Sequence, residues 1–138
     1  YPDITNLWVI LSFYNRIFFM KLKPHLASST YVFAQVNNLN GVPFDDILCT
    51  FREKEGITLI LTKEDAIRHG LSFEYEAAWI SLQLETDLEM VGLTAEFSTA
   101  LADEGISCNV IAAYHHDHIF VALEDAENAI ETLQSLDI

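Results

Sequence analysis

The stretch Asp87–Val121, DLEMVGLTAEFSTALADEGISCNVIAAYHHDHIFV, decides the fold of this chain. Its first part predicts a helix over Val91–Glu104, because apolar side chains recur there at helical spacing and Gly105 follows as a terminator. The apolar positions of that helix are Leu93, Phe97, Ala100 and Leu101. The second part predicts two strands, Ile106–Ala113 and Ile119–Leu123, joined across the turn Tyr114–His118. The stretch therefore indicates a mixed α and β fold.

The segments on either side complete one structural unit. Tyr75–Glu85 predicts a long strand, because apolar side chains alternate along it. Glu124–Leu136 predicts a closing helix with one apolar face, and its two leading acids suit a helix amino terminus. The order β-α-β-β-α with a right-handed crossover gives a ferredoxin-like half, in which both helices lie on one face of an antiparallel sheet. The other face and the strand edges then need cover from a second half or a second chain.

The first half of the chain repeats this unit in degenerate form. Leu59–Ala66 (LILTKEDA) and Ile119–Ala126 (IFVALEDA) align without a gap at a spacing of 60, and each reads as a strand that runs into a helix. The other elements expected here are a strand at Tyr31–Val36, a hairpin of Ile47–Arg52 and Ile57–Leu61, and a short helix at Lys63–His69. The loop Asn37–Ile47 stands where the first helix of the unit should be. The sequence thus predicts an α+β protein of two halves, residues 23–73 and 74–138.

The amino end, residues 1–22, is read separately. Leu7–Met20 is apolar but short, and polar residues interrupt it, whereas a membrane span needs about 20 apolar residues. A signal peptide would need a basic start and a cleavage site of small residues, and this end shows neither. We expect a helix at Ile4–Met20 that packs on the core, or an extension foreign to the native protein.

The composition favours some classes of partner over others. Lys and Arg total 7 against 21 Asp and Glu, so the formal net charge is −14. Such a surface repels phosphate, which argues against nucleic-acid and membrane-surface binding. Cys49 and Cys108 are the only cysteines and form no C-x-x-C pattern, which favours a reducing, cytoplasmic location.

Several motifs resemble the ACT domain, and above all the small stand-alone tandem-ACT proteins. In the second half they are Val91–Thr94, Ser98–Leu101, Gly105–Val110 and Tyr114–Val121; in the first half they are Lys23–Pro24, Leu26, Tyr31–Phe33 and Thr50–Gly56. The resemblance implies a non-catalytic regulatory module without a cofactor, which binds an amino acid or related metabolite, commonly where domains pair. It also implies a homo-oligomer, with any regulated activity residing in an enzyme or transport partner. The alternative is a structural interaction module that binds no small ligand.

The turn before the predicted helix is the expected binding site. In ACT domains this strand-to-helix turn commonly contributes to the ligand pocket, and the matching residues here are Asp87, Leu88, Val91, Gly92, Leu93 and Thr94. Amide groups at the helix start could hold a carboxylate, and Gly92 permits close approach. Asp87 fits either a helix cap or an acceptor for a ligand ammonium group. Asn109 could bind the same ligand or tie the neighbouring strand.

The cluster of His115, His116, Asp117 and His118 has the residue types of a metal site, yet adjacent strand positions point to opposite faces. We therefore expect a solvated hairpin without metal, and treat pH sensing by these histidines as a hypothesis. Cys108 with a histidine would suggest a thiol nucleophile, but no oxyanion-hole turn accompanies it. We expect Cys108 to be a core residue and the protein to be no enzyme.

Overall fold

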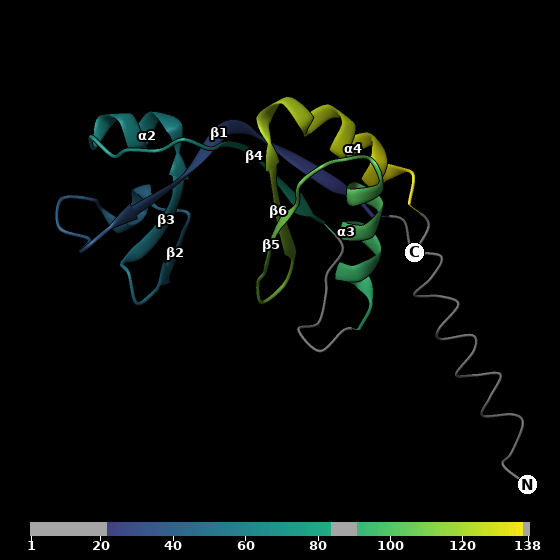
Figure 1. Ribbon diagram of the computed structural model, residues 1–138, viewed down its shortest axis with the longest axis horizontal. Helices are drawn as coiled ribbons and strands as arrows, with labels where there is room; N and C mark the ends of the chain where they lie inside the picture. Colours follow the sequence, from purple (N-terminus) through teal and green to yellow (C-terminus); the bar gives the residue numbers. More distant parts are fainter. Residues whose placement is uncertain (1–21, 84–90, 137–138) are drawn as a thin grey trace, which may run out of the picture.

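The computed structural model describes residues 22–83 and 91–136, and in these ranges the chain forms one six-stranded antiparallel sheet with helices on one side (Figure 1). The strands are β1 (Pro24–Val36), β2 (Cys49–Arg52), β3 (Ile57–Thr62), β4 (Glu76–Leu82), β5 (Asn109–Ala112) and β6 (Asp117–Ala122). The helices are α2 (Lys63–Arg68), α3 (Leu93–Asp103) and α4 (Ala126–Gln134), with short 3₁₀ helices η1 (Phe44–Asp46) and η2 (Leu123–Asp125). The expected helix at Ile4–Met20 lies outside the described residues.

The two central strands, β1 and β4, join the halves into one sheet of order β2-β3-β1-β4-β6-β5. The first half uses β2-β3-β1-β4 and the second uses β1-β4-β6-β5, and each set has the strand order of a ferredoxin-like unit. Strand β1 pairs with β4 along two stretches, Pro24–Leu26 and Thr30–Val32, with a register shift between them. The chain's first strand therefore also completes its second half. The predicted α+β, ferredoxin-like fold is confirmed.

The three α-helices of the described residues cover the same face of the sheet. In the second half α3 and α4 bury Phe97, Leu101, Ala129 and Leu133 against Ile80 and neighbouring strand residues. In the first half α2 contributes only Ala66 to the core, and the loop after β1 adds Val42 and Ile47. The opposite face carries a third cluster, rich in aromatic side chains, around Ile60, Ala77 and Phe120. The sheet therefore has one helix-covered face and one aromatic face.

Some predicted boundaries are wrong for identifiable reasons. Strand β1 begins at Pro24 rather than Tyr31, because pairing with β4 orders a segment that has no apolar alternation of its own. Strand β5 begins at Asn109 rather than Ile106. The Ile106 amide instead donates to the Leu101 carbonyl (2.9 Å), and both side chains are buried in one cluster. Ile106 thus ends helix α3 in a Schellman-type stop, with Gly105 at φ 73°.

No helix in the described ranges is long and apolar enough to cross a membrane.

Candidate functional site

The predicted turn before α3 is described only in its second part. Asp87 and Leu88 lie outside the described residues, while Gly92 adopts φ 96° and is the amino-terminal cap of α3. Val91 is 95% exposed, whereas Leu93 is 6% exposed and packs into the second-half core. The Leu93 side chain therefore faces away from any surface ligand. Val91, Gly92 and Thr94 are exposed at the start of the helix, and their role in binding stays a prediction.

Asn109 lies on β5 directly opposite Phe120 of β6, on the aromatic face of the sheet. Its side-chain amide donates to the Phe120 carbonyl oxygen at 3.4 Å, so it ties the neighbouring strand. Burial raises the pKa of the Tyr75 hydroxyl, and the Asn109 amide offsets part of that rise. Within the described residues the buried Tyr75 hydroxyl has no partner at hydrogen-bonding distance and angle, so the two groups approach each other without forming a good bond.

The histidine-rich segment is less solvated than the sequence suggested. Asp117 is buried, and both Asp117 and His118 belong to β6 rather than to the turn. Trp79 donates its indole N–H to His118 Nδ1 at 3.0 Å. Because an indole can only donate, Nδ1 of His118 must accept and therefore carries no proton. Burial lowers the pKa of His118, the nearby His116 lowers it further, and Asp117 opposes them.

No group of three or more His, Cys, Asp or Glu side chains in the described part of the chain could hold a metal ion. Cys108 packs against the second-half core, and burial raises the pKa of its thiol to about 11. A thiol with that pKa stays protonated at neutral pH and is a poor nucleophile. These segments therefore offer neither a metal cluster nor an activated cysteine.

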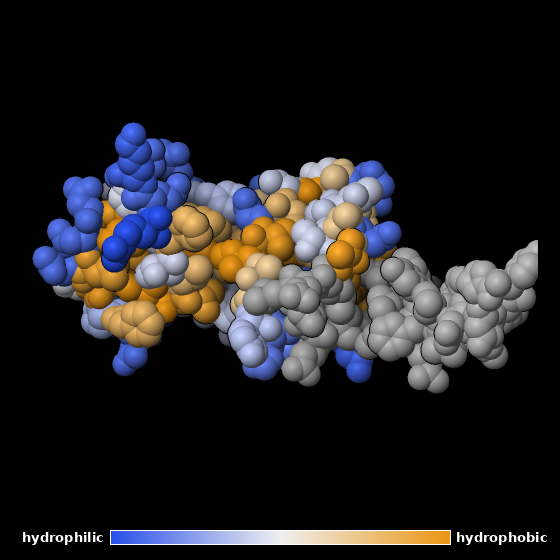
Figure 2. Space-filling view, turned by 90° about the horizontal axis from the view of Figure 1, so that it is seen from below, coloured by the Kyte–Doolittle hydropathy of each residue, from blue (hydrophilic) through white to orange (hydrophobic). Residues whose placement is uncertain are grey.

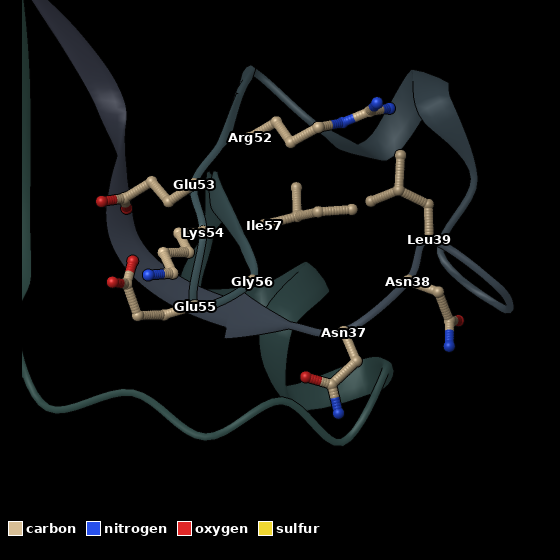
Figure 3. A pocket seen from close by; sticks show the side chains of 9 residues that line it. All are labelled: Asn37, Asn38, Leu39, Arg52, Glu53, Lys54, Glu55, Gly56 and Ile57. Atoms are coloured by element: carbon tan, nitrogen blue, oxygen red, sulfur yellow. The ribbon is translucent and has the colours of Figure 1, made fainter.

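A hollow of about 580 Å³ lies in the first half, at a place that sequence reasoning missed (Figure 3). One wall is Asn37–Leu39, the turn that follows β1, and the other is Arg52–Ile57, which includes the β2–β3 turn. In the close-up Ile57 and Leu39 point toward one another and Arg52 extends toward the same side. Glu53, Lys54 and Glu55 point the opposite way. The hollow therefore offers an apolar base beside one guanidinium group.

The hollow is topologically equivalent to the turn predicted as the binding site. The turn after β1 follows the first strand of the first half, as the turn before α3 follows the first strand of the second half. No helix follows it here, only η1, which leaves the turn residues Asn37, Asn38 and Leu39 exposed. Arg52 and Lys54 take part in none of the ion pairs found among the described residues. In the sequence, the available signal for this hollow was the pair Arg52 and Lys54, two of only 7 Lys and Arg residues in the chain, together with the Asn-rich turn after β1.

Comparison with known proteins agrees with this architecture. Residues 74–135 match a family model of the ACT domain, and residues 18–78 match a second ACT-domain model. No curated protein matches the chain. A crystal structure from Vibrio cholerae, of a protein of unknown function called a possible transport protein, is 42% identical, with a TM-score of 0.78. The match covers 87% of this chain and 92% of that one.

Two more distant structures share the fold. A protein from Agobacterium tumefaciens is 15% identical over 83% of this chain and 87% of its own, with a TM-score of 0.67. The ligand-free regulatory subunit of aspartate kinase from Thermus thermophilus is 11% identical, with a TM-score of 0.59. That match covers 82% of this chain and 95% of the subunit. The chain therefore belongs to the ACT-domain family and carries two ACT domains in tandem.

Proposed function

We propose that this protein is a non-catalytic regulatory module that binds an amino acid or a similar small carboxylate at the turn after β1 and at the equivalent turn before α3. The observation that carries the proposal is the hollow beside the turn after β1, where a guanidinium group that forms no ion pair with any described residue borders an apolar base. Its volume falls within the usual range for small-molecule sites, roughly 300–1,000 Å³. The fold supports the same reading, since the Thermus protein is named a regulatory subunit.

Each part of the hollow has a chemical role in this proposal. The Arg52 guanidinium presents a planar set of donors that matches the two oxygens of a carboxylate. Asn37 and Asn38 form the rim of the hollow, where their side-chain amides point away from Leu39 and Ile57, and Asn38 Oδ1 accepts from the Asn40 amide at 2.9 Å. Leu39 and Ile57 provide an apolar surface for the rest of the ligand. A small molecule with a carboxylate and a modest apolar part fits these groups best.

The corresponding turn of the second half is the second element of the proposal. There the exposed amides at the start of α3, with Gly92 allowing close approach, would receive the ligand carboxylate. The residues concerned are Asp87, Leu88, Val91, Gly92, Leu93 and Thr94, together with Asn109. Leu93 would contribute its backbone, because its side chain lies in the core.

The shared strands suggest how binding could be communicated. β1 leads directly into the first hollow, β4 leads toward the second turn, and the two strands pair with each other. A ligand that favours one geometry of either turn would therefore bias the strand pair common to both halves. In this proposal the module acts as a homo-oligomer and passes the change to a regulated enzyme or a transport partner.

The test is a panel of the common amino acids and related carboxylates, measured by thermal shift and then by calorimetry. A true ligand at 100 times its dissociation constant should stabilise the protein by about 2.7 kcal/mol. Arg52→Ala should weaken binding at the first turn by about tenfold, because a charge-assisted hydrogen-bond pair is lost. Lys54→Ala is the matched control, since it removes a cation from the same hairpin but from the side that faces away from Leu39.

A lack of stabilisation by every compound in the panel would argue for the structural interaction module instead. If Lys54→Ala and Arg52→Ala weaken binding equally, the ligand senses the general charge of the hairpin rather than the hollow. If neither matters but Thr94→Ala does, the second turn is the binding element.

A further inference from the structure

A second cleft lies on the aromatic face of the sheet, where the two β-hairpins approach each other. It measures about 390 Å³ and is lined from β1, β2 and β3 on one side and from β5 on the other. Because β2 and β5 are the two edge strands of the sheet, one cleft can touch both only if the sheet curls strongly. In Figure 1 the hairpins β2–β3 and β5–β6 both descend from the central strands, away from α2 and α4. The cleft thus exists only because the two halves share one curled sheet.

The base and walls of the cleft are apolar. Phe33 and Ile60 are register partners on β1 and β3, and Ile111 closes the cleft from β5. The Phe33 ring packs edge-on against Phe120, with ring centres 5.5 Å apart, which holds it in place. Figure 2, seen from below, shows hydrophobic side chains gathered across this face. Phe51, which is 69% exposed, borders the cleft.

One carboxylate stands among these apolar groups. Glu53 lines the cleft and points away from Arg52, which belongs to the other hollow. The Thr58 hydroxyl donates to Oε1 of Glu53 at 2.7 Å and so orients the carboxylate. That bond uses one acceptor site of the carboxylate and leaves its other oxygen able to receive a donor. No cation forms an ion pair with Glu53 within the described residues.

These observations define the ligand by its chemistry. We propose that the cleft binds a small apolar or aromatic molecule that carries a protonated amine and no carboxylate. The amine would donate to Glu53, and the exposed ring of Phe51 would add a cation–π contact. The apolar body would lie against Phe33, Ile60 and Ile111. A free amino acid fits poorly, because its own carboxylate would be brought close to Glu53.

The binding test uses three related compounds: tryptamine, the neutral 3-methylindole, and tryptophan. Calorimetry on the full chain should show saturable tryptamine binding with a dissociation constant of about 1 mM or lower. The dissociation constant of 3-methylindole should be at least tenfold higher, and that of tryptophan higher still. Equal affinity for tryptamine and 3-methylindole, or no saturation by tryptamine, would overturn the proposal.

Matched carboxylate variants locate the charge. Glu53→Gln keeps an acceptor for Thr58 but loses the negative charge, so tryptamine affinity should fall about tenfold and 3-methylindole affinity should stay unchanged. Glu55→Gln removes a carboxylate of the same turn that does not line the cleft, and it should change neither affinity. Ile111→Trp should fill the cleft and abolish binding of both compounds. An equal effect of Glu53→Gln and Glu55→Gln would refute the assigned site.

The two cysteines give an independent readout. Cys49 lines the cleft, whereas Cys108 packs against the helix-covered core of the second half. Tryptamine should therefore slow alkylation of Cys49 and leave alkylation of Cys108 unchanged, as measured on peptides by mass spectrometry. If a second copy of the chain fills the cleft instead, Ile111→Glu will break an oligomer in light scattering and wild-type Cys49 will show no protection, which overturns the proposal.

The cleft and the hollow beside the turn after β1 share one lining residue, Glu53, but its side chain points away from Arg52, so the two ligands depend on different charged groups. Arg52→Ala should leave tryptamine binding intact, and Glu53→Gln should leave the amino-acid response intact. Failure of the amine experiments therefore tells against the cleft alone.

Discussion

The two halves of this protein share one sheet but cover it by different means. The second half places two amphipathic helices, α3 and α4, over its strands and buries large side chains such as Phe97 between them. The first half has α2, which buries only Ala66, and covers the rest of its face with the loop after β1. A loop can cover a sheet only if its buried backbone N–H and C=O groups find partners, as the Val42 amide does at the Leu39 carbonyl and the Leu48 amide at the Ile60 carbonyl.

Side-chain contacts between η1 and the end of α2 tether this loop. Asp46 of η1 accepts from Arg68 at 2.9 Å and contacts His69 Nε2 at 2.9 Å, while Arg68 also reaches Asp65. Val42, from the same loop, is only 8% exposed and enters the core. The first half therefore exchanges helix packing for a tethered loop, and the turn residues before the tether remain open as the hollow of Figure 3.

The largest test of this comparison removes one covering side chain from each half. Phe97→Ala should cost about 3–5 kcal/mol of unfolding free energy, because a fully buried ring leaves a cavity between α3 and the sheet. Val42→Ala should cost about 1–2 kcal/mol, since fewer carbons leave a site that a loop can close over. Urea unfolding of both variants measures the difference. Equal losses would mean that the loop packs as firmly as the helix.

A smaller effect distinguishes the glycines of the two turns. Gly56 adopts φ 155°, and a β-carbon there would lie 2.9 Å from the Val36 carbonyl oxygen and from Gln35 Nε2. Gly92 adopts φ 96°, but a β-carbon there meets nothing within 4 Å. Gly56→Ala should therefore cost about 2 kcal/mol and Gly92→Ala about 1 kcal/mol in urea unfolding. A smaller loss for Gly56→Ala than for Gly92→Ala would show that the backbone around Gly56 shifts readily enough to relieve these close contacts.

The sequence was sufficient for the features that repeat along the chain. The matched segments at Leu59 and Ile119, the helix around Phe97 and the loop in place of the first helix all have local signals, and they lead to the observed fold. The sequence also predicted the ends of helices that are terminated by glycine. Gly70 and Gly105 both take positive φ, and in each case the next amide donates to the carbonyl five residues earlier.

Features that depend on pairing across the sheet could not be read locally. The segment Pro24–Thr30 has no strand pattern, and it is extended only because β4 lies beside it. His118 and Trp79 are 39 residues apart, so nothing in the sequence predicts their hydrogen bond. Both hollows combine residues of separate elements, and curling of the sheet brings β5 toward β2. The expected site near Gly92 was inferred from family resemblance and still awaits a ligand experiment.

The helix starts of the repeated segments differ by one side chain. Thr62 caps α2, its hydroxyl accepting from the Asp65 amide at 3.1 Å, whereas the equivalent Ala122 offers no cap and η2 precedes α4. Thr62→Ala should cost about 1 kcal/mol in urea unfolding, because a helix-start amide loses its acceptor. Thr62→Ser is the control and should retain most of the stability. A neutral Thr62→Ala would show that the Asp46 tether alone holds α2.

The smallest effects concern pH, and the two halves should respond in different windows. Contact with His69, together with Arg68, lowers the pKa of Asp46 below 3.8. A carboxylate whose pKa is lower in the folded state stabilises it above the unfolded value and loses that contribution as pH falls. Asp46→Asn should therefore be less stable than wild type near neutral pH, and the two unfolding curves should converge in strong acid. Asp45→Asn, on the same 3₁₀ helix, is the control.

In the second half, the titration of His118 should change the stability at a higher pH than the titration of Asp46 does in the first half. Burial lowers its pKa below 6.5, so the unfolded chain binds the extra proton first, and stability falls as pH drops below 6.5. Asp117 works in the opposite direction, because burial raises its pKa above 3.8 and the folded state then takes up the proton more readily. The His118 contribution is therefore measured as the difference between wild type and His118→Gln in urea unfolding from pH 7 to pH 5. A difference that stays constant over that range would mean that His118 takes up its proton at the same pH in the folded and the unfolded chain, and a pH response would then belong to the first half alone.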